Sequence, residues 1–430
     1  MAENTKTSLR NLTIYQVFLR QHLKGTFKSL EKDLNRIRNL GIDIIYLLPV
    51  HPIGELQRKG SVGSPYSIKD YLAIDDTFGT MEDFKALIKA AHQLNLKIMI
   101  DIVFHHTALD AKLLATNPEW YYYKNGKLSG KVGDWSDITD LDFEKQPLWD
   151  YLIEVLLYYA KIGVDGIRAD VASLIPIEFW LKARKALLKE NPDFIMLAES
   201  VHLGFVKEIR DQGFYAASDS ETYQAFDILY DYDIHDLFLN YLSDKGNLNR
   251  WLEAIVKQES IYSNNYVKLR NLENHDQDRI ASYFSADKLL QINALLFFLK
   301  GTTMIYAGQE YGVSKKPNLF ENDVIDLTPK NEQLTNLIIK LANFKKDSLF
   351  SEGNFKIHFQ DKEIAVITYQ NAHSIALGVF NLGNEKGFIT VPFPDGVYDN
   401  ILYPQKLSIT NAQMELTEKP IVLFTIKKEL

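Results

Sequence analysis

Lys97-Ile-Met-Ile-Asp-Ile-Val103 is a short apolar run that follows a longer amphipathic stretch at residues 81–94. The same alternation, a short run rich in Ile, Val or Tyr beside a longer amphipathic stretch, repeats between about residues 12 and 345. This repetition is typical of β-α units, whose strands pair in parallel. The sequence therefore predicts an α/β fold with a parallel sheet.

Eight of the short runs have the length and composition of buried strands, which is the number in a (β/α)₈ TIM barrel. These strands are predicted at residues 12–20, 43–48, 97–103, 165–170, 194–199, 214–218, 267–274 and 302–307. Helices are predicted at residues 29–39, 81–94, 146–161, 176–189, 286–300 and 330–344, with shorter ones between. We expect the barrel to occupy residues 1–106 and 145–350.

Two segments depart from this alternation. Residues 107–144, after the third predicted strand, are rich in Trp, Tyr, Gly and Asp and are predicted to form a small inserted subdomain. From residue 351, patterns such as Ile364-Ala-Val-Ile-Thr-Tyr369 replace helical periodicity. Alternating patterns of this kind favour antiparallel strands, so residues 351–430 are expected to form a C-terminal β-sandwich-like domain.

Composition narrows the classes of function. The chain has 430 residues, of which 46% are hydrophobic and 24% charged, as in soluble globular proteins with two or three domains. A net charge of −8 disfavours a nucleic-acid partner, because such binding depends on clustered Lys and Arg. The absence of cysteine excludes disulfides and thiolate chemistry. A neutral ligand fits this composition better.

The amino-terminal residues 1–10 are polar and lack the apolar region of a secretory signal, and no run approaches transmembrane length. We therefore expect a cytoplasmic protein without a membrane partner. The sequence does not indicate the oligomeric state.

Polar residues end several of the predicted strands. In a (β/α)₈ barrel, catalytic groups gather at the carboxyl ends of the strands, because those ends and their loops form the open face. The groups expected to meet there are Asp101, His106, Arg168, Asp170, Glu199, His275 and Asp276. Taken singly, each would more often be a loop residue or a helix cap, but together they predict a site rich in carboxylates.

Asp170, Glu199 and Asp276 follow three different strands, so only barrel closure would bring them together. Arg168 lies two residues before Asp170 and should point the same way, which would hold Asp170 ionised. Glu199, in a drier place, could keep a raised pKa and a proton to donate. Glycoside hydrolysis needs such a division between a nucleophile and an acid. The alternative for Arg168 and Asp170 is a structural ion pair.

The chain resembles the α-amylase family (glycoside hydrolase family 13) over nearly its whole length. The resemblance rests on four motifs in the family's order and spacing: Asp101-Ile-Val-Phe-His-His106, Gly166-Ile-Arg-Ala-Asp170, Leu197-Ala-Glu199 and Asn274-His-Asp276. Supporting stretches include Gly63-Ser-Pro-Tyr66 and Gly301-Thr-Thr-Met-Ile-Tyr-Ala-Gly-Gln-Glu310.

The resemblance implies that Asp170 is the nucleophile, Glu199 the general acid/base and Asp276 the third acid, which steadies the distorted sugar. It also implies that the other matched residues bind that sugar or orient the acids: Asp101, His106, Arg168 and His275. Tyr66 matches the tyrosine that stacks on the sugar, a role that suits its flat apolar face.

The resemblance also implies a calcium ion between the barrel and the inserted subdomain, but this sequence departs from the usual ligands. His105 stands where an Asn commonly binds the ion, and imidazole is a poor ligand for a cation that prefers oxygen. Ser173 and Leu174 replace a Lys-His pair whose last residue donates a carbonyl. The sequence therefore predicts no required cofactor, no metal site and no usual calcium site.

Two further features bear on substrate binding. Arg279 lies where exo-acting members carry an Arg that grips the nonreducing end, but Ser67 stands where the partner Asp would be, which disfavours strict exo action. The run Trp120-Tyr-Tyr-Tyr123 suits either a sugar-stacking platform or the core of the subdomain, and core packing is the commoner outcome.

These observations predict a retaining hydrolase that cleaves mainly α-1,4 bonds in maltodextrins or starch-like oligosaccharides. One alternative is a glucanotransferase or another transglycosidase that passes the same intermediate to a sugar. Another is a glucosidase acting on α-1,6 bonds. A noncatalytic glucan-binding relative is disfavoured, because all three acids are present.

Overall fold

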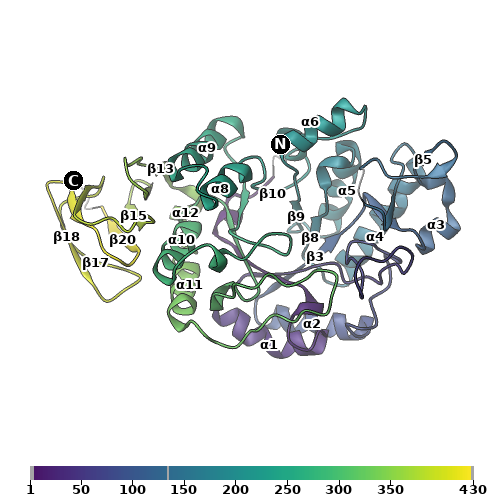
Figure 1. The fold of residues 1–430 in the computed structure, drawn as a ribbon, viewed down its shortest axis with the longest axis horizontal. Helices are drawn as coiled ribbons and strands as arrows, with labels where there is room; N and C mark the ends of the chain where they lie inside the picture. The colour runs from purple at the N-terminus through teal and green to yellow at the C-terminus, as the bar shows by residue number, and fades with distance from the viewer. Residues whose placement is uncertain (1–3, 133–134, 428–430) are drawn as a thin grey trace.

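The computed structural model describes residues 4–132 and 135–427 and contains a closed barrel of eight parallel strands (Figure 1). Neighbouring strands follow the order β1-β12-β11-β10-β9-β8-β3-β2, and β2 pairs with β1 to close the barrel. Their bounds are β1 (Thr13–Val17), β2 (Ile44–Leu47), β3 (Lys97–Ile102), β8 (Gly166–Ala169), β9 (Ile195–Ala198), β10 (Ile228–Tyr230), β11 (Lys268–Arg270) and β12 (Thr302–Tyr306). The predicted fold class is confirmed.

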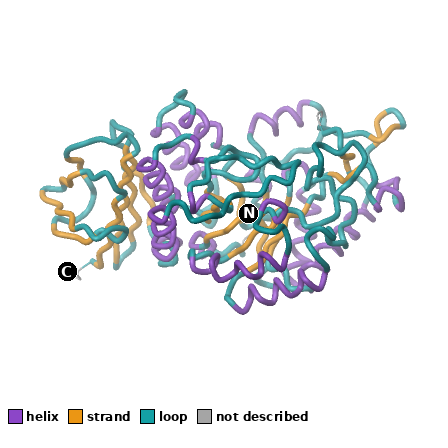
Figure 2. Tube along the Cα trace, turned by 60° about the horizontal axis from the view of Figure 1, so that its bottom comes forward, coloured by secondary structure: helices purple, strands orange, loops and turns teal. Residues whose placement is uncertain are grey.

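Helices pack around this barrel (Figure 2). They are α1 (Phe27–Asn39), α2 (Met81–Gln93), α4 (Gln146–Lys161), α5 (Ile177–Glu190), α6 (Leu203–Asp211), α7 (Asp219–Thr222), α8 (His235–Leu242), α9 (Leu248–Ile261), α10 (Ala286–Phe298), α11 (Glu332–Phe344) and α12 (Leu349–Glu352). In α1, a capping box between Thr26 and Ser29 satisfies free N–H groups at the helix start, and every third or fourth side chain from Phe27 is buried. Each of the six predicted helices overlaps one of these.

The sixth predicted strand, at residues 214–218, is wrong. This segment lies in the loop between α6 and α7, where the Ser218 side chain accepts a hydrogen bond from the Glu221 N–H and so starts α7. Ala216 and Ala217 are buried although they belong to no strand. The sixth strand is instead β10, which pairs with β9 and β11. A short apolar run alone does not distinguish a buried loop from a strand.

The chain leaves the barrel after β3 to form the inserted segment. There β4 (His106–Ala108) pairs with β7 (Ile138–Asp140), and β5 (Tyr123–Lys124) forms a hairpin with β6 (Lys127–Leu128). The short helix α3 (Lys112–Thr116) lies between β4 and β5. The hairpin and the C-terminal strands lie at opposite ends of the molecule (Figures 1 and 2).

The C-terminal region contains two antiparallel sheets, as predicted. One has the order β13 (Asn354–Ile357), β14 (Ile364–Gln370), β15 (Ser374–Asn381) and β20 (Ile421–Ile426). The other has the order β16 (Phe388–Thr390), β19 (Gln413–Glu415), β18 (Lys406–Thr410) and β17 (Gly396–Asp399). Successive side chains of β14 face opposite ways: Ala365 joins the barrel core and Val366 joins the core between the sheets.

The predicted domain boundaries remain predictions. His106 is placed at the end of the barrel segment in that division, but it is the first residue of β4. Residues 1–3, 133–134 and 428–430 of the predicted ranges lie outside the described residues. Within the described ranges, no helix combines the length and the apolar character needed to cross a bilayer.

Gly301 precedes β12 with φ +141°, and a Cβ at this position would overlap the carbonyl oxygen of Lys268. We expect Gly301→Ala to lower the free energy of unfolding by about 3 kcal/mol or more, because backbone strain adds to the overlap. Gly213→Ala is the matched control, since Gly213 also has a positive φ, +82°, but no heavy atom lies within 4 Å of a Cβ there. It should cost only about 1 kcal/mol, the penalty of a Cβ in the left-handed region. Equal denaturant midpoints for the two variants would contradict this explanation.

Candidate active site

Neighbouring strands place the predicted site residues at one end of the barrel. Asp101 on β3 is the direct register partner of Arg168 on β8, so their side chains point to the same side. Asp170 follows β8, and its N–H donates to the Ile102 carbonyl at 2.9 Å. Glu199 follows β9, and its N–H donates to the Ala169 carbonyl at 3.0 Å.

Arg168 contacts three carboxylates. Its Nη1 donates to Asp101 Oδ1 at 2.9 Å and to Asp170 Oδ1 at 2.7 Å. Its Nη2 lies 2.7 Å from Glu199 Oε1. The guanidinium is fully buried, and Asp170 and Glu199 are 7% and 8% exposed. The sequence suggested a pairing with Asp170 alone, whereas the barrel also brings Asp101 and Glu199 onto the same cation.

The backbone after Asp170 also orients Glu199. Val171 has φ +35° and ψ 44°, a left-handed conformation that a β-branched residue rarely adopts. In this conformation the Val171 N–H donates to Glu199 Oε2 at 2.9 Å. Strained residues of this kind persist where the surrounding structure holds them, often at functional sites.

Burial raises the pKa of the Asp170 carboxyl well above its usual value, and the Glu199 charge raises it further against the opposing effect of Arg168. This direction is opposite to the sequence prediction, in which Arg168 keeps Asp170 ionised. The physical reason is that the guanidinium is shared among three carboxylates, so it does not neutralise Asp170 by itself. A buried acidic group in these surroundings holds a proton to higher pH than an exposed one.

The third acid, Asp276, has different surroundings, because its side chain is 49% exposed. His275 Nε2 lies 3.0 Å from Asp276 Oδ2. Partial burial raises the pKa of Asp276, but His275 outweighs burial and lowers it to about 2. Asp276 is therefore ionised at neutral pH.

Tyr66 connects two of the other predicted residues. Its hydroxyl donates to Asp101 Oδ2 at 3.1 Å and lies 2.5 Å from His275 Nε2. The Tyr66 and His275 rings stack at a centroid distance of 5.5 Å. The hydroxyl of Tyr46, on β2, also donates to Asp101 Oδ2, at 2.6 Å. Gln16, on β1, contacts His275 Nδ1 at 3.0 Å.

The three acids open into one pocket of about 240 Å³, which is also lined by Tyr66 and His106. Burial lowers the pKa of His106 to about 3, so its imidazole is neutral at pH 7. Trp135 lines the same pocket and packs beside His106 at a centroid distance of 5.4 Å.

Several residues of this region were not predicted from the sequence, among them Gln16, Tyr46, Trp135 and Asp137. Gln16 carried a signal, because its polar side chain is fully buried in β1, between Tyr15 and Val17. No pattern in the sequence indicated Trp135 and Asp137. They line the pocket only because of the way the inserted segment folds.

Arg279 does not join the site, and its predicted role in substrate binding is corrected. The guanidinium is fully buried, donates to Glu273 Oε1 at 2.6 Å and to the Ala307 carbonyl at 2.9 Å, and lies over the Tyr306 ring. A buried Arg needs such partners. Ser67 likewise faces inward and donates to the Asp137 carbonyl at 3.0 Å.

The side chains at the position of the family's calcium ion are poor ligands for calcium. His105 Nε2 lies 3.7 Å from Asp140 Oδ2, and His105 Nδ1 lies 3.1 Å from His106 Nδ1. Calcium takes six to eight oxygen ligands, whereas this group offers two imidazoles and one carboxylate. Burial, and then the nearby Lys131 ammonium, lowers the pKa of His105 to about 3. Two imidazoles and the positive charge of nearby Lys131 disfavour a cation that prefers oxygen ligands, so these residues do not fit calcium.

Two family models match the chain. The catalytic domain of the α-amylase family matches residues 4–131 and 131–349, and the bacterial α-amylase C-terminal domain matches residues 356–423. Among curated relatives, a maltosyltransferase from Picrophilus torridus that uses α-1,4-glucan and maltose 1-phosphate is 25% identical over 90% of this chain. The intracellular maltogenic amylase of Bacillus subtilis is 25% identical over 84% of it. The chain spans 64% and 62% of these two relatives.

Solved structures are more similar over the full length. An α-amylase from Lactobacillus plantarum is 39% identical, with a TM-score of 0.94, over 98% of this chain and 100% of that one. The noncanonic maltogenic α-amylase AmyB from Thermotoga neapolitana is 32% identical, with a TM-score of 0.88, over the same shares. With the catalytic-domain model matching nearly all of the barrel and the inserted segment, the chain belongs to the α-amylase family.

Proposed function

We propose that this protein is a retaining glycoside hydrolase that cleaves α-glucosidic bonds, mainly α-1,4 bonds, in maltodextrins and similar oligosaccharides. The observation that carries the proposal is the pair of carboxyls, Asp170 and Glu199, held on neighbouring nitrogens of the Arg168 guanidinium at the open end of the barrel. Retaining hydrolysis requires two carboxyl groups close together on one sugar.

In the first step Asp170 attacks the anomeric carbon and forms a glycosyl ester, while the bond to the leaving oxygen breaks and Glu199 gives that oxygen its proton. Arg168 contacts Asp170 Oδ1, which leaves Oδ2 for the attack. In the second step Glu199 takes a proton from water, the hydroxide attacks the anomeric carbon, and Asp170 is released. The α configuration is restored by the two inversions.

The charges of the cluster suit this sequence of steps. Burial and the neighbouring carboxylates raise the pKa of Asp170, so attack by Asp170 requires that its proton has passed to Glu199 when the sugar is bound. Glu199 must hold that proton when the leaving oxygen departs. Asp276, ionised at neutral pH, stabilises the positive charge that develops on the sugar ring.

The substrate assignment rests on the pocket and on the relatives. Half-buried Tyr66 offers a ring face beside the acids, and pyranose C–H groups pack against such faces. Similarity to the maltogenic amylase of Bacillus subtilis and to the amylase of Lactobacillus plantarum supports α-glucans as the substrate class. We also propose a cytoplasmic location, which the relative described as intracellular supports. Neither a nucleic acid nor a membrane is proposed as a partner.

A transglycosidase is the second candidate. Similarity to the maltosyltransferase of Picrophilus torridus favours it, because a transferase passes the same glycosyl ester to a sugar instead of water. An α-1,6-acting glucosidase is the third, because a probable oligo-1,6-glucosidase of Bacillus subtilis is 23% identical over 75% of this chain.

We expect purified protein incubated with maltopentaose to release only shorter sugars, each formed first as the α-anomer. The measurement is a time course that resolves products by chain length and follows the anomeric protons by NMR. Products longer than maltopentaose would favour the transglycosidase. Initial β-anomers would contradict retention, and the absence of turnover on any α-glucan would contradict the proposed hydrolase.

Glu199→Gln should lower kcat on maltopentaose by about 10²–10⁴-fold, the usual contribution of a positioned proton donor. Its first step should recover on a glycosyl fluoride, because fluoride leaves without protonation. Asp170→Asn should lose activity on both substrates, because it removes the nucleophile. Asp150→Asn is the control, since Asp150 is an exposed partner of Lys182. Recovery of Asp170→Asn but not Glu199→Gln on the fluoride would reverse the assigned roles.

We also propose that the activity requires no metal ion, because the group formed by His105, His106 and Asp140 does not fit calcium. Dialysis against EDTA should leave kcat and the melting temperature unchanged, and added CaCl₂ should raise neither. Loss of activity that calcium restores would contradict the proposal. Restoration by zinc alone would instead assign a metal to the two imidazoles.

A further inference from the structure

Tyr232 lies close to the acids, although no motif in the sequence indicates it. It belongs to the loop between β10 and α8, so it follows the strand that the sequence predicted wrongly. Its side chain is half-buried, and its ring packs against those of Tyr230 and His235 at centroid distances of 5.0 and 5.3 Å. Packing accounts for the ring, but it does not account for the hydroxyl.

The Tyr232 hydroxyl holds the loop that carries the third acid. It accepts hydrogen bonds from Asn274 Nδ2 at 2.9 Å and from Gln277 Nε2 at 3.4 Å. On the other side of the same amide, Asn274 Oδ1 accepts from the N–H groups of Asp276 at 2.9 Å and Gln277 at 3.1 Å. Because a backbone N–H can only donate, Oδ1 must face these two groups and Nδ2 must face Tyr232.

A neutral imidazole lies at the far end of this network. Gln277 Nε2 is 3.1 Å from Nε2 of His235, the first residue of α8. Burial lowers the pKa of His235 to about 4, so at pH 7 its Nε2 can accept the amide N–H. The network therefore runs from α8 through Gln277 and Tyr232 to Asn274, and it joins the loops that follow two neighbouring strands, β10 and β11.

Asp276 depends on this loop for its position. Among the described residues its carboxylate makes one polar contact, with His275 Nε2 at 3.0 Å, and the side chain is 49% exposed. Its backbone is held by Asn274 at the N–H and by Lys316 Nζ, 2.5 Å from the carbonyl oxygen. Asn274 is buried, so without the Tyr232 hydroxyl its Nδ2 would lose its partner, which is costly in buried surroundings.

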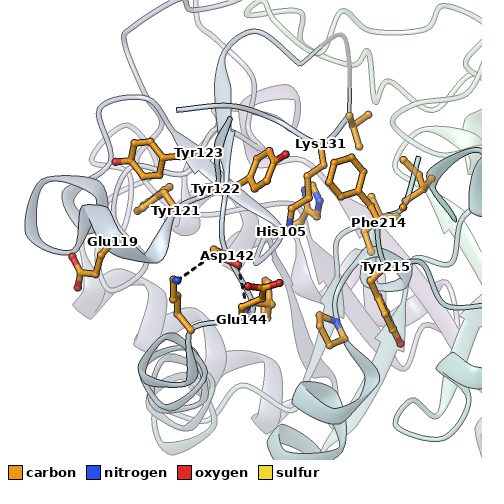
Figure 3. Close-up of a pocket in the computed structure, with 17 residues that line it drawn as sticks. His105, Glu119, Tyr121, Tyr122, Tyr123, Lys131, Asp142, Glu144, Phe214 and Tyr215 are labelled. Carbon is orange, nitrogen blue, oxygen red and sulfur yellow. Dashed lines mark hydrogen bonds and ion pairs between the residues drawn. The ribbon is translucent and has the colours of Figure 1, made fainter. Parts of the chain in front are cut away.

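The network adjoins the acids and is separate from the pocket beside them. That pocket lies between the inserted segment and the loop that follows α6, where the Tyr122 and Phe214 rings meet edge to face (Figure 3). Tyr232 and the residues bonded to it do not line it. Burial first, and then charges that include those of Glu199 and Asp276, raise the pKa of Tyr232 well above its usual value. The hydroxyl therefore lies within electrostatic reach of two of the acids.

We propose that Tyr232 is a positioning residue for the third acid. Through Asn274 it fixes the loop of Asp276, so that the carboxylate stays beside the sugar ring on which positive charge develops. A charge stabilises a transition state best when it is already in place, because moving it during the reaction costs part of the gain. The inference rests on the proposed function for the reaction, and it gives Tyr232 no proton to transfer.

The test is Tyr232→Phe, which keeps the ring and removes the hydroxyl. On maltopentaose kcat/KM should fall by about 10–10²-fold, because displacement of a catalytic group by about 1 Å has an effect of this size. The same loss should remain on α-maltosyl fluoride. Departure of fluoride needs no proton from Glu199, but it still builds positive charge on the ring. Glu199→Gln, by contrast, should recover on this substrate.

A double-mutant cycle tests the route through Asp276. Asp276→Asn removes the charge but keeps the N–H that Asn274 holds. If Tyr232 acts through that charge, adding Tyr232→Phe to Asp276→Asn should change kcat/KM on the fluoride by less than about twofold. A merely structural role would lower the melting temperature and would slow the reaction by the same factor in both backgrounds.

Tyr283→Phe is the matched control. It also removes a tyrosine hydroxyl, one that donates to Asp278 Oδ2 at 3.2 Å, two residues beyond Asp276. Among the described residues this hydroxyl has no hydrogen bond to Asn274. The control variant should retain the wild-type kcat/KM on both substrates.

An unchanged kcat/KM in Tyr232→Phe, or an equal loss with and without the charge of Asp276, would overturn the positioning role. Recovery of the variant on the fluoride would also overturn it, because the hydroxyl would then act on the proton of Glu199. Turnover by the wild-type protein separates this inference from the proposed function. If the wild type hydrolyses maltopentaose and Tyr232→Phe does so equally well, the proposed function stands without this role. Without wild-type turnover on either substrate, both are lost.

Discussion

The buried guanidinium of Arg168 is the interaction on which the candidate site depends. It joins Asp101, Asp170 and Glu199, which come from three adjacent strands of the barrel. Burying three carboxylates without a cation would cost far more than the fold can supply, and removing the cation would leave those charges unpaired. Burial, together with the same shortage of positive charge, raises the pKa of Asp170. Arg168 is therefore needed both to pair the buried carboxylates and to set the charge of the candidate site.

The inserted segment adds side chains to the site that the barrel strands form. It contributes His106 and Trp135 to the pocket of the acids. The strand pair β4 and β7 joins the two ends of the segment, and Asp140 contacts His105 and accepts a hydrogen bond from the Lys131 N–H. Neutral imidazoles stand where an oxygen-rich metal site would have to lie, and the positive charge of Lys131 acts on one of them.

The C-terminal sheets lie at the other end of the molecule, away from the inserted segment (Figure 1). Strand β15 packs on α10, where the Phe298 and Phe380 rings lie 5.3 Å apart. Because both faces of the first sheet are covered, β14 is buried along most of its length. This two-sided burial stabilises the barrel helices beside β12 without contributing a described residue to the pocket of the acids.

Sequence by itself determined the fold class, seven of the eight strands and the order of the motifs that carry the acids, because apolar periodicity and the residues at strand ends are local properties. Tertiary structure alone decided which residues share a contact. It moved the sixth strand from residues 214–218 to β10, because burial in a loop and burial in a strand leave the same apolar pattern. In the folded chain Arg279 pairs with Glu273, and Arg168 contacts both Glu199 and Asp170. These contacts join residues far apart in the chain, and only closure of the barrel sets the distances between them.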